Sequence, residues 1–195
     1  MLLEAVQGSQ PDEQDILRKD GEKREEDAKE GKMNASAAVA YDVALRAVEP
    51  IRVAAIRGVV PDMEQTGDTF DRLFGILEEC VERNGGAAGP HMAIYHDAGT
   101  GPWKLDMRIE LAVPFEGAGF SAEHVYVHEL PSVGQMACVV HNGPFEEIGN
   151  AYNAVMEWAR ERGYHVAGPS REIYLSCGDG DSAKYVTEVQ IPMAR

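Results

Sequence analysis

The sequence predicts an α+β fold in which two similar units of type β-β-α-β-β follow one another along the chain. Three observations carry this prediction. Short motifs repeat in the same order 78 to 82 residues apart, each half contains short runs of alternating apolar residues, and each half contains one segment of helical periodicity. Because one helix covers only one face of a small sheet, we expect the two sheets to join into a larger one.

The internal repeat is visible at four places. The matched pairs are Glu64 and Gly67 with Glu146 and Gly149, Gly89-Pro90 with Gly168-Pro169, Ile94-Tyr95 with Ile173-Tyr174, and Glu110–Pro114 with Glu188–Pro192. The spacing drifts from 82 residues for the first pair to 78 for the last, as insertions and deletions in loops produce. We therefore assign repeat one to residues 41–118 and repeat two to residues 119–195.

The first half contains four expected strands and one expected helix. Alternating runs predict strands over residues 43–48 and 53–57 before the helix, and over 92–96 and 107–113 after it. The helix is indicated by apolar residues at helical spacing, namely Phe70, Leu73, Phe74 and Leu77. Gly85-Gly86 ends this segment.

The second half repeats the pattern with clearer signals at the helix ends. Strands are expected over residues 125–130 and 136–141, and again over 172–175 and 185–191. Pro144 suits the first helical position, and Gly163 suits a helix end. Between them, apolar residues recur at helical spacing: Ile148, Tyr152, Val155 and Ala159.

Residues 1–40 differ in character from the rest of the chain. Residues 9–32 are dense in both signs of charge and contain only Ile16, Leu17 and Ala28 as apolar residues, which is too little to form a core. We expect a disordered charged tail and linker over 1–40, followed by a folded domain over 41–195. Met33 is an alternative translation start, so the sequence leaves open whether residues 1–32 are a genuine tail.

The composition excludes several classes of protein. The chain has 195 residues and a formal net charge of -15, and an acidic surface repels the phosphate backbone of nucleic acids. No apolar run reaches the roughly 18 residues of a membrane span, and the first residues lack the features of a signal peptide. We therefore expect a cytoplasmic protein with no direct nucleic-acid or membrane partner. The acidic surface could instead contact a protein partner.

Nothing in the sequence indicates a metal or a cofactor. The six histidines are scattered, and the three cysteines, Cys80, Cys138 and Cys177, are widely spaced and never form a C-x-x-C pair. No phosphate loop, dinucleotide fingerprint or Ser-His-Asp order is present. We expect neither a metal site nor a bound cofactor.

Alternation along the last strand of each half assigns its residues to two faces. One face carries the apolar residues Ile109, Leu111 and Val113 in the first half, and Thr187, Val189 and Ile191 in the second. We expect these residues beneath the helices. Glu110 and Glu188 then lie on the face that no helix covers.

The face without helices is expected to mix carboxylates with apolar and aromatic groups. The candidate ligand-binding residues are Glu188, Glu110, Tyr174, Tyr95 and Val186. A carboxylate in a partly dry pocket is costly when unpaired, so a cationic guest would relieve that cost while aromatic rings add cation–π attraction. The alternative is that both glutamates are solvated or pair with Arg108 and Lys184. The pattern alone does not decide between the two.

Three motifs resemble one known family. The segments GPFEEIGNAY, AGPSREIYL and YVTEVQIP are similar, in this order, to motifs of the GyrI-like effector-binding domain found at the C-terminus of many multidrug-sensing transcription activators. The resemblance covers residues 41–193, and its first-repeat part is looser. It implies one curved antiparallel sheet with two helices on one face. On the other face, between the two repeats, it implies a groove that takes lipophilic, often cationic, aromatic compounds. By motif position, it implies that Glu188 lies in this groove.

The resemblance leaves three functions open. A stand-alone drug-binding or resistance protein comes first, because no helix-turn-helix fits into the residues before the fold. A hydrolase that opens the cyclopropane ring of DNA-alkylating natural products comes second, with Glu188 or Glu110 as the catalytic acid or base. The third is the sensory domain of a regulator whose DNA-binding part is separate. Trp103, in the loop before the fourth strand, is a further ligand-binding candidate as a lid, or else packs on the domain surface.

Overall fold

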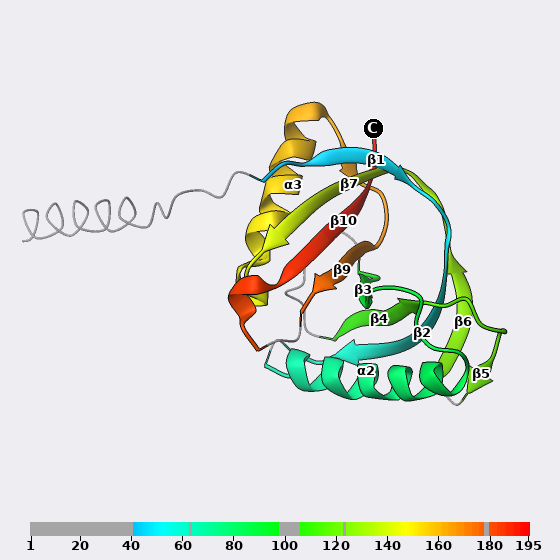
Figure 1. Cartoon of the computed structure of the whole chain (residues 1–195). Helices are drawn as coiled ribbons and strands as arrows, with labels where there is room; N and C mark the ends of the chain where they lie inside the picture. Colours follow the sequence, from blue (N-terminus) through cyan, green and yellow to red (C-terminus); the bar gives the residue numbers. More distant parts are fainter. Residues whose placement is uncertain (1–40, 63, 98–105, 123, 178–179) are drawn as a thin grey trace, which may run out of the picture. The chain divides into compact units, whose positions relative to one another are not determined.

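The chain divides between Ala40 and Tyr41 into two units. The computed structural model describes the second unit, Tyr41–Arg195, apart from residues 63, 98–105, 123 and 178–179. Within this part the prediction of an α+β fold with one large antiparallel sheet and two helices is confirmed (Figure 1).

Both repeats follow the predicted order of elements. Repeat one contains β1 (Ala44–Val48), β2 (Ile51–Val60), α2 (Thr66–Arg83), β3 (Met92–Tyr95) and β4 (Met107–Pro114). Repeat two contains β6 (Val125–Leu130), β7 (Val133–Asn142), the 3₁₀ turn η1 (Phe145–Glu147), α3 (Gly149–Arg162), β9 (Ser170–Ser176), the 3₁₀ turn η2 (Ser182–Lys184) and β10 (Val186–Ala194). The two-residue strands β5 (Ser121–Ala122) and β8 (His165–Val166) were not predicted.

The ends of α3 show which sequence signals decide helix boundaries. Gly163 takes the left-handed conformation, with φ of 71°, and its N–H bonds back to the carbonyls of Ala159 and Arg160, so the predicted stop is confirmed. The start differs from the prediction, because Pro144 precedes the η1 turn and the α-helix begins only at Gly149. The η1 turn leaves Phe145 on the surface rather than on a helix face.

The sheet has pseudo-twofold order about its two central strands. The strands run β1-β7-β10-β9-β3-β4-β2-β6-β5, so that β9 of repeat two pairs with β3 of repeat one in the middle. The leading strands are exchanged: β1 of repeat one pairs with β7 of repeat two, and β6 of repeat two pairs with β2 of repeat one. Neither repeat therefore completes a sheet of its own.

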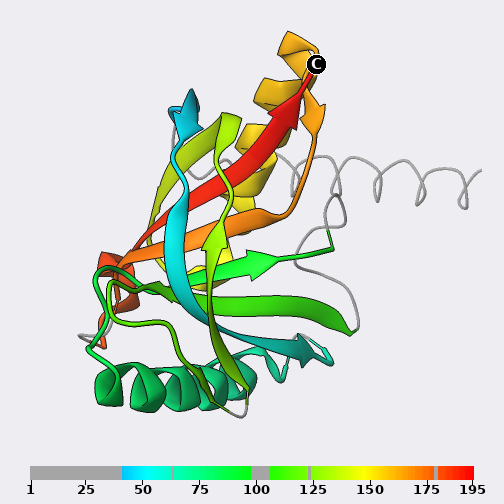
Figure 2. The same ribbon diagram turned by 90° about the vertical axis from the view of Figure 1, so that its right-hand side faces the viewer.

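Each helix covers its own half of one sheet face, which we call the helix face (Figure 2). Leu73, Leu77 and Val81 of α2 pack into a core with the β4 residues expected there, Ile109, Leu111 and Val113. Ala151, Val155 and Ala159 of α3 pack likewise on Val189 and Ile191 of β10. The face assignment of β4 and β10 is thus confirmed.

The opposite face of the sheet, which we call the far face, has a core of its own. Its buried apolar residues are Val53, Ala55, Met92, Ile94, Ala112 and Leu130. No described helix covers them, and the partly buried residues Ile51, Tyr126 and Ile173 pack against them. Among the described helices, none is both long and apolar enough to cross a membrane.

Candidate functional site

A buried carboxylate lies on the helix face at the centre of the sheet. Glu172 of β9 is directly opposite Ala93 of β3 and Val189 of β10, and only 4% of its surface is exposed. Figure 1 shows these central strands between α3 and α2. The position makes Glu172 the innermost acidic side chain of this face.

Three tyrosine hydroxyls donate hydrogen bonds to this carboxylate. Tyr152 of α3 contacts Oε1 at 2.8 Å, while Tyr95 of β3 and Tyr174 of β9 contact Oε2 at 3.0 and 3.1 Å. The three donors come from a helix and from both central strands, so the carboxylate is fixed by elements of both repeats. A carboxylate that accepts several hydrogen bonds keeps a defined orientation.

No basic side chain of the described residues forms an ion pair with Glu172. Burial raises the pKa of Glu172 above its usual value, although the tyrosine hydrogen bonds and the charge of His141 act in the opposite direction. Burial and the nearby carboxylate also raise the pKa values of Tyr95 and Tyr174, so both phenols remain donors. The site thus holds a desolvated acid whose negative charge lacks a cationic partner.

Aromatic rings surround the approach to this carboxylate. Tyr174 makes edge contacts with Phe74 of α2, at 6.3 Å between ring centroids, and with Phe145 of η1, at 5.5 Å. Phe145 also contacts Tyr185, at 5.2 Å, and is 40% exposed. We call these residues the aromatic cluster: Phe74, Tyr95, Phe145, Tyr152, Tyr174 and Tyr185. Most of their rings are half-buried, so the cluster reaches the surface.

The arrangement suits one kind of guest. Aromatic faces attract cations and pack against flat apolar bodies, while the buried acid offers a carboxylate with which no described basic side chain forms an ion pair. A lipophilic aromatic cation satisfies both properties at once. A raised acid pKa beside fixed phenol groups is also a feature that proton-transfer chemistry uses.

The predicted positions of Tyr95 and Tyr174 are wrong. Both were expected on the same face as Glu110 and Glu188, but Tyr95 lies opposite Ile109, and Tyr174 lies opposite Thr187, both on the helix face. The physical reason is register: side chains alternate with a period of two, and the cross-strand pairing here puts the preceding isoleucines on the far face instead.

Glu110 lies on the far face as expected, but it already has partners. It is 1% exposed, and its oxygens contact Arg57 Nε at 3.2 Å, His96 Nε2 at 2.9 Å and His128 Nε2 at 2.5 Å. Burial alone would raise the pKa of Glu110, but these three partners hold it down at about 2. The alternative pairing with Arg108 is also wrong, because Arg108 pairs with Asp97.

Glu188 lies on the far face in the other half of the sheet. Its Oε1 pairs with Arg46 of β1 and accepts a hydrogen bond from Gln190 Nε2, the latter at 2.7 Å. Val186 lies two residues earlier on the same strand face and is half-buried. The alternative pairing of Glu188 with Lys184 is not what the structure shows, since Lys184 contacts Asp181. Trp103 lies outside the described residues.

The structure therefore separates the predicted site residues into two groups. It brings Tyr95 and Tyr174 together around Glu172 on the helix face and leaves Glu110, Glu188 and Val186 on the far face. Sequence reasoning missed Glu172, Tyr152 and Phe145. The spacing of Glu172 and Tyr174 in the motif R-E-x-Y was the available signal, because residues two apart on a strand share a face.

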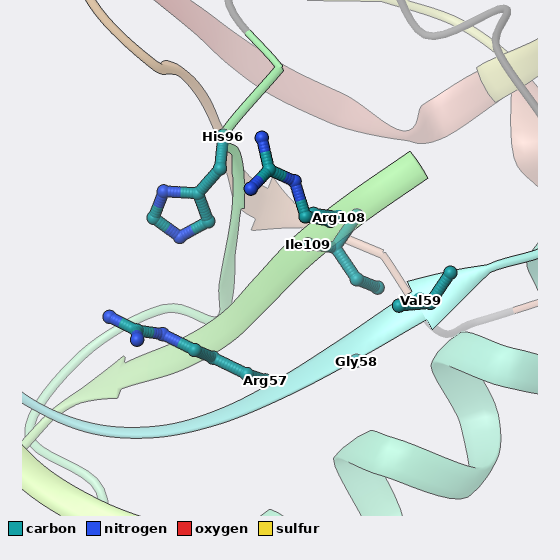
Figure 3. Close-up of a pocket in the computed structure, with 6 residues that line it drawn as sticks. All are labelled: Arg57, Gly58, Val59, His96, Arg108 and Ile109. Carbon is teal, nitrogen blue, oxygen red and sulfur yellow. The ribbon is translucent and has the colours of Figure 1, made fainter. Parts of the chain in front are cut away.

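The far face carries an open pocket of a different character. It has a volume of about 600 Å³ and is lined by Arg57, Gly58, Val59, His96, Arg108 and Ile109 (Figure 3). Its polar lining residues are basic, so it disfavours the cation that the helix face suits. Within the described part of the chain, no group of three or more histidine, cysteine or acidic residues is arranged to hold a metal ion.

A duplicated α+β domain with a buried carboxylate beneath an aromatic cluster defines a small-molecule-binding domain. The chain belongs to the family of the GyrI-like small molecule binding domain, whose model matches residues 41–194. None of the curated proteins is significantly similar in sequence to this chain.

Solved structures share this fold. The C-terminal domain of EcmrR is 25% identical, with a TM-score of 0.69 over 80% of this chain and 98% of that domain. A hydrolase encoded by lin2189 from Listeria innocua is 14% identical, with a TM-score of 0.56 over 85% of this chain and 97% of that one. SAV2435 bound to tetraphenylphosphonium is 16% identical, with a TM-score of 0.53 over 78% of this chain and 94% of that one.

Proposed function

We propose that this protein binds lipophilic aromatic cations on the helix face, with Glu172 as the anchor, and that it acts as a drug-binding protein. The observation that carries the proposal is the desolvated carboxylate of Glu172, which has three phenol donors but no basic partner among the described residues. A guest cation supplies the positive charge that would pair with Glu172, and the aromatic cluster packs against the apolar body of the guest.

Two comparisons support this choice of guest. The fold is that of a family named for small-molecule binding, and SAV2435, which shares the fold, binds tetraphenylphosphonium. Tetraphenylphosphonium is an aromatic cation without hydrogen-bond donors, so its binding depends on charge and ring contacts alone. It is therefore a suitable probe for this chain.

Calorimetric titration of the full chain should show tight binding of tetraphenylphosphonium and at least about 100-fold weaker binding of tetraphenylborate. The two ions have nearly the same shape and opposite charge, so the difference reports the negative charge at the anchor, because like charges in a buried site cost several kcal/mol. Equal affinities for the two ions would contradict the proposal.

Glu188 and Glu110 are the other candidate anchors, and Glu188→Gln provides the matched control. Glu188 is already paired with Arg46, so its loss should leave the affinity for tetraphenylphosphonium within about twofold. A large loss in this variant would instead locate the cation on the far face.

Hydrolysis is a second candidate function, favoured by the raised pKa of Glu172. An acid that stays protonated at higher pH can donate a proton to a carbon as a strained ring opens, while water adds its oxygen to the other carbon of the broken C–C bond. The phenols of Tyr95 and Tyr174 would then orient the acid. Only the shared fold, and not the 14% identity, links this chain to the Listeria hydrolase.

Mass spectrometry separates the two functions. A binder returns a cyclopropane-bearing alkylator unchanged, whereas a hydrolase converts many equivalents to a product heavier by one water. If the chain is a hydrolase, Glu172→Gln should slow turnover by about 100-fold or more, since general acid assistance is typically worth that much. Consumption no faster than in buffer would reject hydrolysis for this class of compound.

The similarity to the C-terminal domain of EcmrR supports a third function, in which the same bound cation is sensed on behalf of a separate DNA-binding protein. The acidic surface is the feature that such a partner would contact. This function requires the same cation site, so the titrations above also test its first step.

A further inference from the structure

The pocket on the far face collects hydrogen-bond donors in an otherwise acidic chain. It lies over β2, β3 and β4, where His96 and Arg108 are neighbours through the hydrogen bond from the His96 N–H to the Arg108 carbonyl. Figure 3 shows the Arg57 side chain extending from β2 toward the same region. Val59, which is 48% exposed, provides the accessible apolar part of the lining.

The donors of this pocket are only partly used. Arg57 gives its Nε–H to Glu110, at 3.2 Å, and neither of its terminal nitrogens hydrogen-bonds to a described residue. Arg108 gives Nε and Nη2 to Asp97, at 3.1 and 2.7 Å, which leaves its Nη1 unengaged. Both guanidinium groups are more than 60% exposed, at 66% and 70%, and can therefore reach a guest.

The ring of Tyr126 lies against Arg57, 5.4 Å from the guanidinium carbon. Its hydroxyl is buried beside Arg57 and Glu110, whose charges act on its pKa in opposite directions, and Tyr126 is not among the residues that line the pocket. Tyr126 therefore supports the Arg57 side chain through a cation–π contact and does not itself face the pocket.

The acceptors of the pocket, in contrast, are already occupied. Glu110 is shared by Arg57, His96 and His128, and Asp97 is held by Arg108. Arg171, buried on the same face, adds a further positive charge that interacts with Glu110. Among the described residues of the pocket, the hydrogen-bonding atoms that remain without a partner are therefore donors. Such a pocket suits an anion and disfavours a cation.

We propose that this pocket is a second binding site, for an organic anion whose carboxylate or phosphate group accepts hydrogen bonds from Arg57 and Arg108. The apolar part of the anion lies against Val59. The site is on the opposite sheet face from Glu172 and has the opposite charge preference. It is thus independent of the proposed cation site, and the two proposals can fail separately.

Titration followed by NMR tests this proposal with three small probes on the full chain. Benzoate and phenyl phosphate should both shift the imidazole resonances of His96, which lines the pocket, whereas benzylammonium should not. The tighter of the two anions identifies the head group, carboxylate or phosphate. Saturation with tetraphenylphosphonium should leave the affinity for the anion unchanged. Absence of histidine shifts with either anion, or equal shifts with benzylammonium, would overturn the proposal.

Two variants and a control assign the donors. Arg57→Gln should weaken anion binding by about tenfold or more, as expected for losing a charged hydrogen-bond donor. Arg108→Gln should weaken it by about threefold to tenfold, a smaller loss because Asp97 already accepts from two nitrogens of Arg108. Arg160→Gln, an exposed arginine on α3, should change nothing. Unaltered affinity in both pocket variants would place the anion elsewhere.

Discussion

Replacing Glu172 by glutamine is expected to lower the affinity for tetraphenylphosphonium by about 30-fold to 5,000-fold. The glutamine keeps the size of the side chain. Its oxygen accepts hydrogen bonds from Tyr95 and Tyr174, and its amide nitrogen donates to the Tyr152 hydroxyl, so the shape of the site is preserved. What is lost is the buried negative charge, and removing one partner of a desolvated charge pair costs roughly 2 to 5 kcal/mol. Titration calorimetry of the variant and of the unaltered protein measures the difference directly.

The same variant should not destabilise the unliganded protein. The folded state raises the pKa of Glu172, so the ionised carboxylate opposes folding, and stability falls as pH rises through the raised pKa. Glu172→Gln removes this decline in stability. In the unaltered protein, the affinity for the cation should fall as the pH drops below the pKa of Glu172, because the carboxylate is then protonated. A variant that loses both stability and cation binding would show instead that Glu172 has a structural role.

Replacing Glu110 by glutamine is expected to have the opposite effect on stability, a loss of about 2 to 3 kcal/mol near neutral pH. The pKa of Glu110 is lowered in the folded protein, from a usual 4.5 to about 2, so its ionised form stabilises the fold. Glutamine leaves Arg57, His96 and His128 around a neutral group in a buried site. Urea denaturation at several pH values measures the loss.

The pH dependence distinguishes this effect from simple misfolding. Stability contributed by a lowered carboxyl pKa is fully present above pH 4.5 and is lost as pH falls toward 2, so the variant and the unaltered protein should converge in acid. Glu188→Gln is the control, since its partner Arg46 is half-exposed and the pair should contribute less than about 1 kcal/mol. A constant difference at all pH values would contradict the ion-pair explanation.

Much of the fold follows from patterns within single segments. The repeated motifs predicted that the β-β-α-β-β unit occurs twice. Alternation along β4 and β10 correctly assigned Leu111 and Val189 to the helix face. These predictions succeed because period-two alternation is a local property of one strand. The stop at Gly163 succeeds for the same reason, because one residue in the left-handed conformation ends the helix.

The site was harder to predict because it depends on relations between segments. The faces of Tyr95 and Tyr174 depend on how β3 and β9 pair with their neighbours, which the pattern of either strand alone leaves open. His128 reaches Glu110 only because β6 of the second repeat pairs with β2 of the first. Because these two strands belong to different repeats, the spacing of residues within one repeat could not predict this contact.

The central pairing of β3 with β9 places two equivalent positions of the repeats face to face. Ile94 corresponds to Ile173, so Ala93 corresponds to Glu172, and these two residues are direct cross-strand partners. In a symmetric pair of identical units with exchanged leading strands, this position would bring two carboxylates against each other, and like charges directly opposite repel. Joining the units in one chain lets the two positions differ. A single acidic side chain then lies on the symmetry axis, with only a methyl group opposite it, and the asymmetry of the duplicated chain is what gives the proposed cation site its single anchor.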